Sequence, residues 1–149
     1  MHNLFFYPYL SGAGYPLWNS GIRGSFMGIG LEHNRFDFAR AIMEGVAFGV
    51  RRALDDFSSN GFHTKVLKIM GGGAKSDLWC RIISAAVNRP IEISDENEAC
   101  AMGAAIIAAA GAGEFSSLND AVKTMAAATR RELPDPKLVS CLEWDKIAQ

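Results

Sequence analysis

The residues with the clearest chemical potential form the run Ile69-Met70-Gly71-Gly72-Gly73-Ala74-Lys75-Ser76-Asp77, near the middle of the chain. Three consecutive glycines carry no side chains, so a flat ring or a phosphate group can lie directly against their backbone. Ser76 is a candidate helix N-cap, and the unpaired amides of a helix start favour a nearby anion. The alternative is structural, because a glycine triplet also makes a tight connection between a strand and a helix.

The segments on either side of the glycine run indicate how it is positioned. Residues 66–70 are a short apolar and β-branched run, which is typical of a buried strand. Residues 76–88 carry apolar side chains at helical spacing and end before Pro90, which disfavours continuation of a helix. The local expectation is therefore a strand, a glycine turn and a helix.

Several motifs that would explain the chemistry differently are missing from the sequence. The run lacks the spacing of a Walker motif, and it fails the dinucleotide fingerprint because position 76 is serine. No Gly-x-Ser-x-Gly nucleophile motif is found. His2, His33 and His63 lie in polar or terminal segments and are expected to be solvated loop residues. We therefore predict no catalytic residue and no metal ligand within this chain.

The first third of the chain changes character twice. Residues 4–10 are an aromatic run that favours an edge strand, and residues 11–30 are rich in glycine and predict an irregular loop. Residues 36–57 carry apolar side chains at three- and four-residue steps, so we expect a long amphipathic helix capped by Asn34. Glu44 on this helix either faces solvent or contacts a ligand.

The remainder of the chain completes the expected fold class. The further elements we expect are a strand at 91–93, an alanine-rich helix at 99–110 and a helix at 118–127. Residues 132–149, which include Trp144, are expected to form an extended tail. This order is β-α-β-α with helices on both sides of a small sheet, so the predicted class is α/β.

Composition limits the classes of function. A chain of 149 residues with an apolar share of 49% fits one domain, and a net charge of -1 gives no electrostatic case for nucleic acid. Three widely spaced cysteines suggest neither a disulfide framework nor a zinc site, so a reducing cytoplasm is the expected location. The most apolar run, residues 99–112, is too short for a membrane span.

Four segments occur in an order that is characteristic of one enzyme family. They are Tyr9-Leu10-Ser11-Gly12 followed by Pro16, Trp18 and Arg23-Gly24; Ala39-Arg40-Ala41 followed by Glu44-Gly45; the glycine run with Trp79; and Glu98-Ala99-Cys100-Ala101-Met102-Gly103-Ala104-Ala105. Together they resemble motifs of the FGGY family of carbohydrate kinases, especially its xylulokinase branch, and the resemblance is strongest over residues 5–115. One departure is Ala13-Gly14-Tyr15, which stands where the family has Glu-Arg-Thr.

The resemblance implies an actin-like ATPase architecture with two ribonuclease-H-like domains, of which residues 1–149 would be an incomplete C-terminal domain. ATP and a sugar or polyol would lie between the domains, with Mg²⁺ in the complete enzyme, and the γ-phosphoryl group would pass to a sugar hydroxyl. By position, Gly72 and Gly73 would lie against adenine or ribose, and Lys75, Ser76 and Asp77 would line the rim of the nucleotide.

The same resemblance places the catalytic base and the phosphate-binding loops outside this chain, in the N-terminal kinase domain and in the first strands of the C-terminal domain. We therefore expect the isolated chain to be inactive. The alternative is a non-catalytic association module that forms homo-oligomers through the exposed edge of its aromatic N-terminal strand. A third interpretation, an unrelated Rossmann-like binder, rests on the glycine turn alone.

Overall fold

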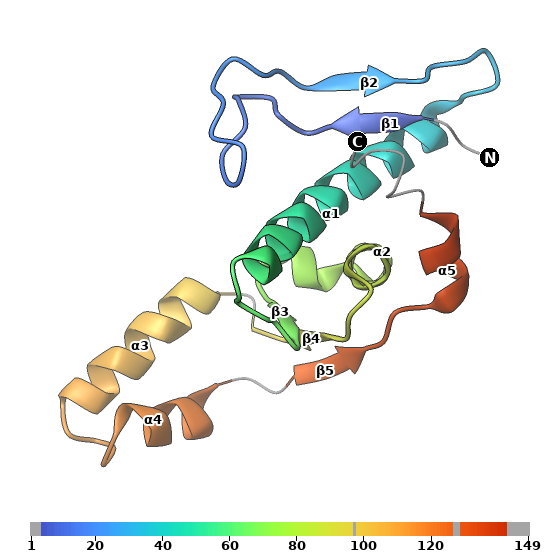
Figure 1. Cartoon of the computed structure of the whole chain (residues 1–149). Helices are drawn as coiled ribbons and strands as arrows, with labels where there is room; N and C mark the ends of the chain where they lie inside the picture. The colour runs from blue at the N-terminus through green and yellow to red at the C-terminus, as the bar shows by residue number, and fades with distance from the viewer. Residues whose placement is uncertain (1–3, 97, 127–128, 143–149) are drawn as a thin grey trace.

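The computed structural model describes residues 4–96, 98–126 and 129–142 (Figure 1). The elements, in chain order, are β1 (Phe5–Tyr7), β2 (Ser25–Met27), α1 (Arg35–Ser59), β3 (Leu67–Ile69), the 3₁₀ helix η1 (Gly72–Lys75), α2 (Asp77–Val87), β4 (Ile91–Ser94), α3 (Ala99–Gly111), α4 (Leu118–Met125), β5 (Thr129–Glu132) and α5 (Pro136–Cys141). Helices α1 and α2 lie over one face of a small sheet, the β1–β2 hairpin lies across α1, and α3 with α4 projects to one side (Figure 1).

The central sheet has the strand order β3-β4-β5. Strands β3 and β4 are parallel and are joined through η1 and α2, which confirms the predicted strand, glycine turn and helix. Strand β5 is antiparallel to β4 and was not predicted from the sequence. Its residues, Thr-Arg-Arg-Glu, are mostly exposed, so this strand is held by backbone pairing with β4 and has no apolar periodicity to reveal it.

The hydrophobic core lies between this sheet and helices α1 and α2. Leu67 pairs with Ile91 and Ile69 pairs with Ile93 across the parallel ladder, so these side chains share one face of the sheet. Ile91 and Ile93 are almost completely buried, and the same cluster includes Phe48 of α1. Burial of each isoleucine side chain stabilises the fold by about 1.5–3 kcal/mol.

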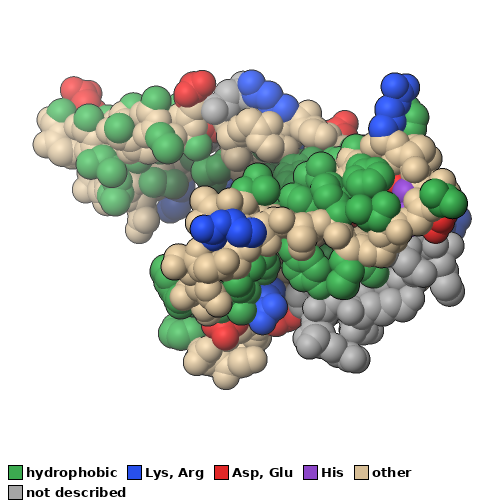
Figure 2. All heavy atoms as spheres, turned by 90° about the horizontal axis from the view of Figure 1, so that it is seen from above, with side chains coloured by type: hydrophobic (Ala, Val, Ile, Leu, Met, Phe, Trp, Pro, Cys, Tyr) green, Lys and Arg blue, Asp and Glu red, His purple; other side chains and the backbone are tan. Residues whose placement is uncertain are grey.

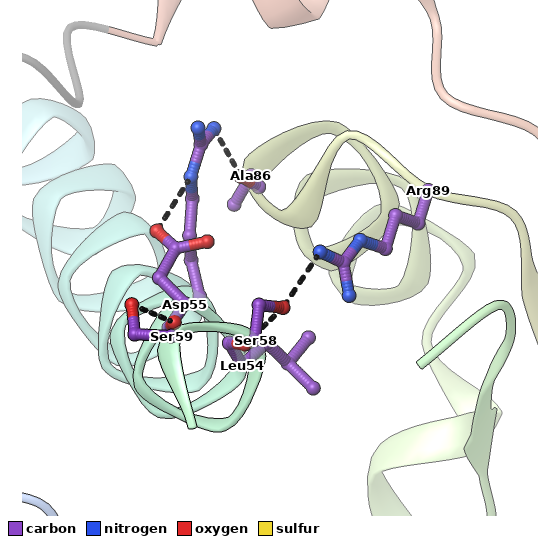
Figure 3. A network of polar contacts seen from close by, with 7 residues as sticks. Leu54, Asp55, Ser58, Ser59, Ala86 and Arg89 are labelled. Atoms are coloured by element: carbon purple, nitrogen blue, oxygen red, sulfur yellow. Dashed lines mark hydrogen bonds and ion pairs between the residues drawn. The ribbon is translucent and has the colours of Figure 1, made fainter. Parts of the chain in front are cut away.

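Polar contacts fix α1 against α2 at the far end of this core (Figure 3). Arg51 donates a hydrogen bond of 2.9 Å to the carbonyl oxygen of Ala86 and forms an ion pair of 3.5 Å with Asp55. Arg89, which follows α2, reaches Ser58 of α1 at 3.5 Å and also donates to the carbonyl oxygen of Thr64 at 3.0 Å. These contacts set the end of α1 against the C-terminal end of α2.

Helix α1 begins and ends where the sequence predicts. The side chain of Asn34 accepts a hydrogen bond of 2.9 Å from the amide of Phe36, and the carboxylate of Asp37 accepts one of 2.9 Å from the amide of Asn34. This reciprocal capping box satisfies two donors at the helix start. The chain turns away after Asn60, at Gly61, which has a φ of 87°.

The β1–β2 hairpin confirms the expected N-terminal strand but corrects the expectation of an irregular loop over residues 11–30, because β2 lies within that range. Phe6 pairs with Phe26, with ring centroids 4.7 Å apart, and Phe26 packs on Phe38 of α1 at 4.9 Å. Strand β2 has three residues between glycine-rich turns, so its sequence is too short to show alternation.

Helices α3 and α4 pack on each other and extend away from the sheet (Figure 1). Helices were expected on both faces of the sheet. Helices α1 and α2 cover one face, whereas α3 lies near the other face mainly through its first turns, so the expectation is only partly met. Within α3, Ile106 is buried and Ile107 is 66% exposed. This helix is apolar around its whole circumference yet lies largely at the surface.

A short helix occupies part of the segment that was expected to be extended. Asp135 caps α5 by accepting a hydrogen bond of 2.9 Å from the amide of Lys137, and Pro136 stands in the first turn, where proline is tolerated. Leu138 and Leu142 pack against the main core, which explains why the helix forms. The expectation for Trp144 falls outside the described residues.

Candidate functional site

The glycine run forms a sharp turn directly after β3. Gly71 has a φ of 76° and a ψ of −158°, a conformation essentially restricted to glycine. Its amide donates a hydrogen bond of 3.2 Å to the carbonyl oxygen of Glu96, which follows β4. The turn is thus tied to the ends of two neighbouring parallel strands.

Gly72 and Gly73 differ from Gly71, because both are exposed without a positive φ. A Cβ atom built on Gly72 would meet no heavy atom within 4 Å, and one built on Gly73 would contact Trp79 Nε1 at 3.4 Å, an ordinary contact distance. Neither steric crowding nor backbone conformation therefore requires glycine at position 72. The missing side chains leave an open patch of backbone at the surface.

The other predicted site residues follow in the same exposed turn. The hydroxyl of Ser76 accepts a hydrogen bond of 3.3 Å from the amide of Trp79, so Ser76 is the N-cap of α2, as predicted. The carboxylate of Asp77 accepts a hydrogen bond of 2.5 Å from the guanidinium of Arg130 on β5. Lys75 is exposed at the end of η1. All five predicted residues are exposed and lie in one continuous segment, formed by η1 and the start of α2.

A small depression adjoins this turn at the carboxyl ends of β3 and β4. Its volume is about 130 Å³, and its lining includes Met70, Ser94, Glu96 and Met102. In open α/β sheets, ligands bind in the crevice outside the carboxyl ends of the strands. These residues were not predicted from the sequence, although the positions directly after each strand were a usable signal for Met70 and Glu96.

Cys80 lies beneath the glycine turn and stabilises it. Its thiol is within 3.7 Å of the carbonyl oxygen of Ala74 and 3.9 Å of that of Gly73. Burial raises the pKa of the Cys80 thiol, so the protonated form can donate weakly to these carbonyls. All three cysteines are free.

Two expectations for polar residues outside the turn have clear outcomes. The side chain of His33 is only 2% exposed, and its Nδ1 accepts a hydrogen bond of 2.8 Å from the amide of Gly30, which corrects the expectation of a solvated residue. The side chain of Glu44 is only 15% exposed and forms an ion pair with Arg40 on the same helix, so it does not face open solvent, and a ligand contact stays a prediction. His63 is exposed, as expected, and His2 falls outside the described residues.

Across residues 4–96, 98–126 and 129–142, no group of three or more His, Cys, Asp or Glu side chains is arranged to hold a metal ion. Over the same ranges, no helix has both the length and the apolar character needed to cross a membrane.

The parallel strands, the glycine turn at their carboxyl ends and the covering helices define a partial α/β domain of the actin-like ATPase class. The chain belongs to the FGGY family of carbohydrate kinases: the model of this family's C-terminal domain matches residues 1–112. The fold class and the family resemblance predicted from the sequence are thereby confirmed.

Two curated relatives illustrate the similarity. The xylulose kinase of Bacillus subtilis is 38% identical over 119 residues, which cover 80% of this chain and 24% of the relative. The gluconokinase of the same organism is 32% identical over 133 residues, which cover 88% of this chain and 26% of the relative. The chain thus spans about a quarter of the length of the curated relatives that it matches.

Solved structures agree with this family. A ligand-bound xylulose kinase from Lactobacillus acidophilus superposes with a TM-score of 0.81 at 28% identity, over 97% of this chain and 29% of that chain. A glycerol kinase from Plasmodium falciparum with ADP gives a TM-score of 0.74 at 30% identity, over 97% of this chain and 30% of that chain.

Proposed function

We propose that this chain is the adenosine-binding part of an ATP-dependent carbohydrate kinase that transfers the γ-phosphoryl group to a sugar hydroxyl. The observation that carries the proposal is the open backbone at Gly72 and Gly73, at the carboxyl end of a parallel strand in a member of this family. Glycine is not needed there by the fold, so its absence of a side chain is best explained by a ligand.

In this proposal, the planar base or the ribose lies on the backbone of Gly72 and Gly73. Lys75 and Asp77 stand at the rim of the nucleotide, while Ser76 acts mainly by fixing the start of α2. The adjacent depression beside Met70 and Glu96 offers further room at the same edge of the sheet. The similarity to a glycerol kinase structure with ADP supports a nucleotide at this type of domain.

Catalysis requires groups that we assign to other parts of the complete kinase. Phosphoryl transfer needs an aligned acceptor, Mg²⁺ and charge stabilisation around the transferred group. We propose that the N-terminal kinase domain supplies most of these groups, and that this chain alone has no kinase activity. The exposed apolar surface of α3 supports a domain partner, because a helix that is apolar all round is normally buried.

The substrate is proposed only as a class, a sugar or polyol. Relatives of this chain include proteins named xylulose kinase, gluconokinase, erythritol kinase and glycerol kinase, so the family covers several such substrates. We propose the cytoplasm as the location, which the three free thiols support.

An association module is the second candidate. It is favoured by the hydrophobic side chains that gather over the face of the molecule in Figure 2. Exposed apolar residues near the hairpin and the start of α1 are Leu10, Met27, Ile29, Leu31 and Phe36. A stable homo-oligomer of this chain at micromolar concentration in light scattering would favour this candidate, and a monomer would count against it.

Steady-state kinetics of the complete kinase test the ATP proposal. Gly72→Val places a branched side chain where the base would lie and should raise the KM for ATP about tenfold or more, with a smaller effect on the KM for the sugar. Gly14→Val is a matched control, because a Cβ at Gly14 also meets nothing within 4 Å. An unchanged KM for ATP in a folded Gly72→Val enzyme would remove this residue from the site.

A further inference from the structure

A second depression lies between the loop after β1 and the C-terminal end of α1. Its volume is about 590 Å³, and it is lined by Tyr15, Asp56, Phe57, Asn60 and Phe62. No residue of the glycine turn is among these, so it is separate from the proposed adenosine site. We call this depression the aromatic cradle.

Aromatic rings make up most of the lining of the cradle. The ring of Tyr15 lies 5.1 Å from that of Phe57 and 6.4 Å from that of Trp18, measured between centroids. Trp18 is 77% exposed and Phe62 is 71% exposed. Contiguous apolar side chains at a protein surface are a feature of ligand-binding grooves and interaction sites.

The loop that carries Tyr15 is held in place by its own backbone. Ala13 and Asn19 exchange two hydrogen bonds of 2.9 Å, and the amide of Trp18 donates to the carbonyl oxygen of Gly14 at 2.8 Å. The hydroxyl of Tyr15 also donates to the carboxylate of Asp56. The ring of Tyr15 is therefore oriented from both ends, as a preformed site requires.

Asp56 gives the cradle a carboxylate that can carry a negative charge. Within the part of the chain that the structure describes, Asp56 forms no ion pair, whereas its neighbour Asp55 pairs with Arg51 at 3.5 Å. A hydrogen bond from a neutral phenol leaves the carboxylate charge in place.

The end of α1 adds to this negative field. The carbonyl ends of the peptide dipoles point towards the C-terminus of a helix, which favours cations there. The last turn of α1 contains no basic residue, although it contains Asp56. The guanidinium of Arg89 already reaches Ser58 in this turn, and a cation bound beside Asp56 would add a second favourable charge at the helix end.

We propose that the aromatic cradle binds a small organic cation of the alkylammonium type. The ammonium group would lie near the carboxylate of Asp56, and the methylene groups would contact Phe57, Phe62 and Tyr15. Aromatic faces attract cations, most strongly where a hydrophobic wall displaces water. A neutral alcohol would gain only the apolar contacts, and an anion would be repelled by Asp56 and by the helix end.

The test is a titration of the full 149-residue chain with n-butylammonium chloride, followed by NMR of the Trp18 indole and the Asn60 side-chain amide. n-Butanol is the neutral comparison of the same length, and sodium chloride controls for ionic strength. We expect saturable shifts for n-butylammonium with a dissociation constant on the order of millimolar to tens of millimolar, and at least about fivefold weaker binding of n-butanol.

Two charge variants decide the role of Asp56. Asp56→Asn keeps an acceptor for Tyr15 but removes the charge, and it should weaken n-butylammonium binding at least about fivefold. Asp55→Asn is the matched control and should leave binding unchanged. Should Asp56→Asn fail to fold by circular dichroism, Phe62→Leu replaces it, because Phe62 is 71% exposed and leucine keeps an apolar side chain at this position while removing the ring.

Binding that does not saturate, equal binding of n-butanol, or equal effects of the two aspartate variants would overturn the proposal. With Phe62→Leu as the variant, unchanged affinity for n-butylammonium would overturn it.

Discussion

Gly45 of α1 lies directly against Phe6 of β1. A Cβ atom built on Gly45 would overlap the carbonyl oxygen of Phe6 and come within 3.0 Å of its carbonyl carbon. The backbone of the hairpin thus approaches the helix too closely for any side chain at this position. This contact fixes how the N-terminal hairpin sits on the helix that carries the core.

A methyl group at Gly45 should therefore destabilise the protein. We expect Gly45→Ala to lower the free energy of unfolding by about 1–3 kcal/mol, because the obstacle is backbone and cannot rotate away. Gly49→Ala is the matched control, since position 49 is on the same helix and has nothing within 4 Å of a Cβ. It should stabilise the helix by about 0.5–1 kcal/mol. Urea unfolding of both variants checks the opposite signs.

Substitutions at Gly71 and Gly72 should distinguish a glycine that the fold requires from a glycine that nucleotide binding requires. Gly71→Ala forces a side chain into a backbone conformation that only glycine adopts easily, and should cost about 1–3 kcal/mol of stability although the space beside it is open. Gly72→Ala should leave stability nearly unchanged. Thermal unfolding of both variants tests this difference, and equal destabilisation would mean that the turn needs glycine at both positions.

Alkaline titration should single out Tyr15. The hydrogen bond to Asp56 raises the pKa of the Tyr15 phenol above its ordinary value of 10.0. Because the pKa in the folded state is raised, the stability from this contact is present below about pH 10 and is lost as the pH rises through the folded-state pKa.

The absorbance of tyrosinate, followed against pH, measures the raised pKa of Tyr15. The component of the titration that is missing in Tyr15→Phe is the one that belongs to Tyr15. Asp56→Asn should lower the pKa of this component. An unmoved component in Asp56→Asn would contradict the role given to the Asp56 hydrogen bond.

The positions of the helices along the chain were predictable, because a helix leaves a local periodicity of apolar residues in the sequence. Residues of α1 repeat apolar side chains at helical spacing, and the Asn34 and Asp37 pair marks its start. Strand β5 had no such signal, because its polar residues gain their place only from the backbone of β4. The imidazole of His33 accepts a hydrogen bond from the amide of Gly30. This contact depends on the shape of the turn between the two residues, which no periodicity in the sequence reveals.

The candidate site was also predictable only in part. Gly72 and Gly73 follow a strand and precede a helix cap, so the open turn could be expected from the sequence. The depression beside it depends on how Glu96 and Met102 meet after β4, which no local pattern specifies. The aromatic cradle joins Tyr15 to Phe57 across a long stretch of chain, and only the fold brings these rings together.

We propose that adenosine lies on the glycine turn, and photo-crosslinking can locate the adenine ring. The complete kinase would be irradiated with an azido-adenine analogue of ATP, and labelled peptides would be identified by mass spectrometry. We predict labelling within the turn from Gly71 to Asp77 or beside Glu96, suppressed by excess ATP and reduced in Gly72→Val. Labelling confined to other parts of the kinase, with none at this turn, would contradict the claim.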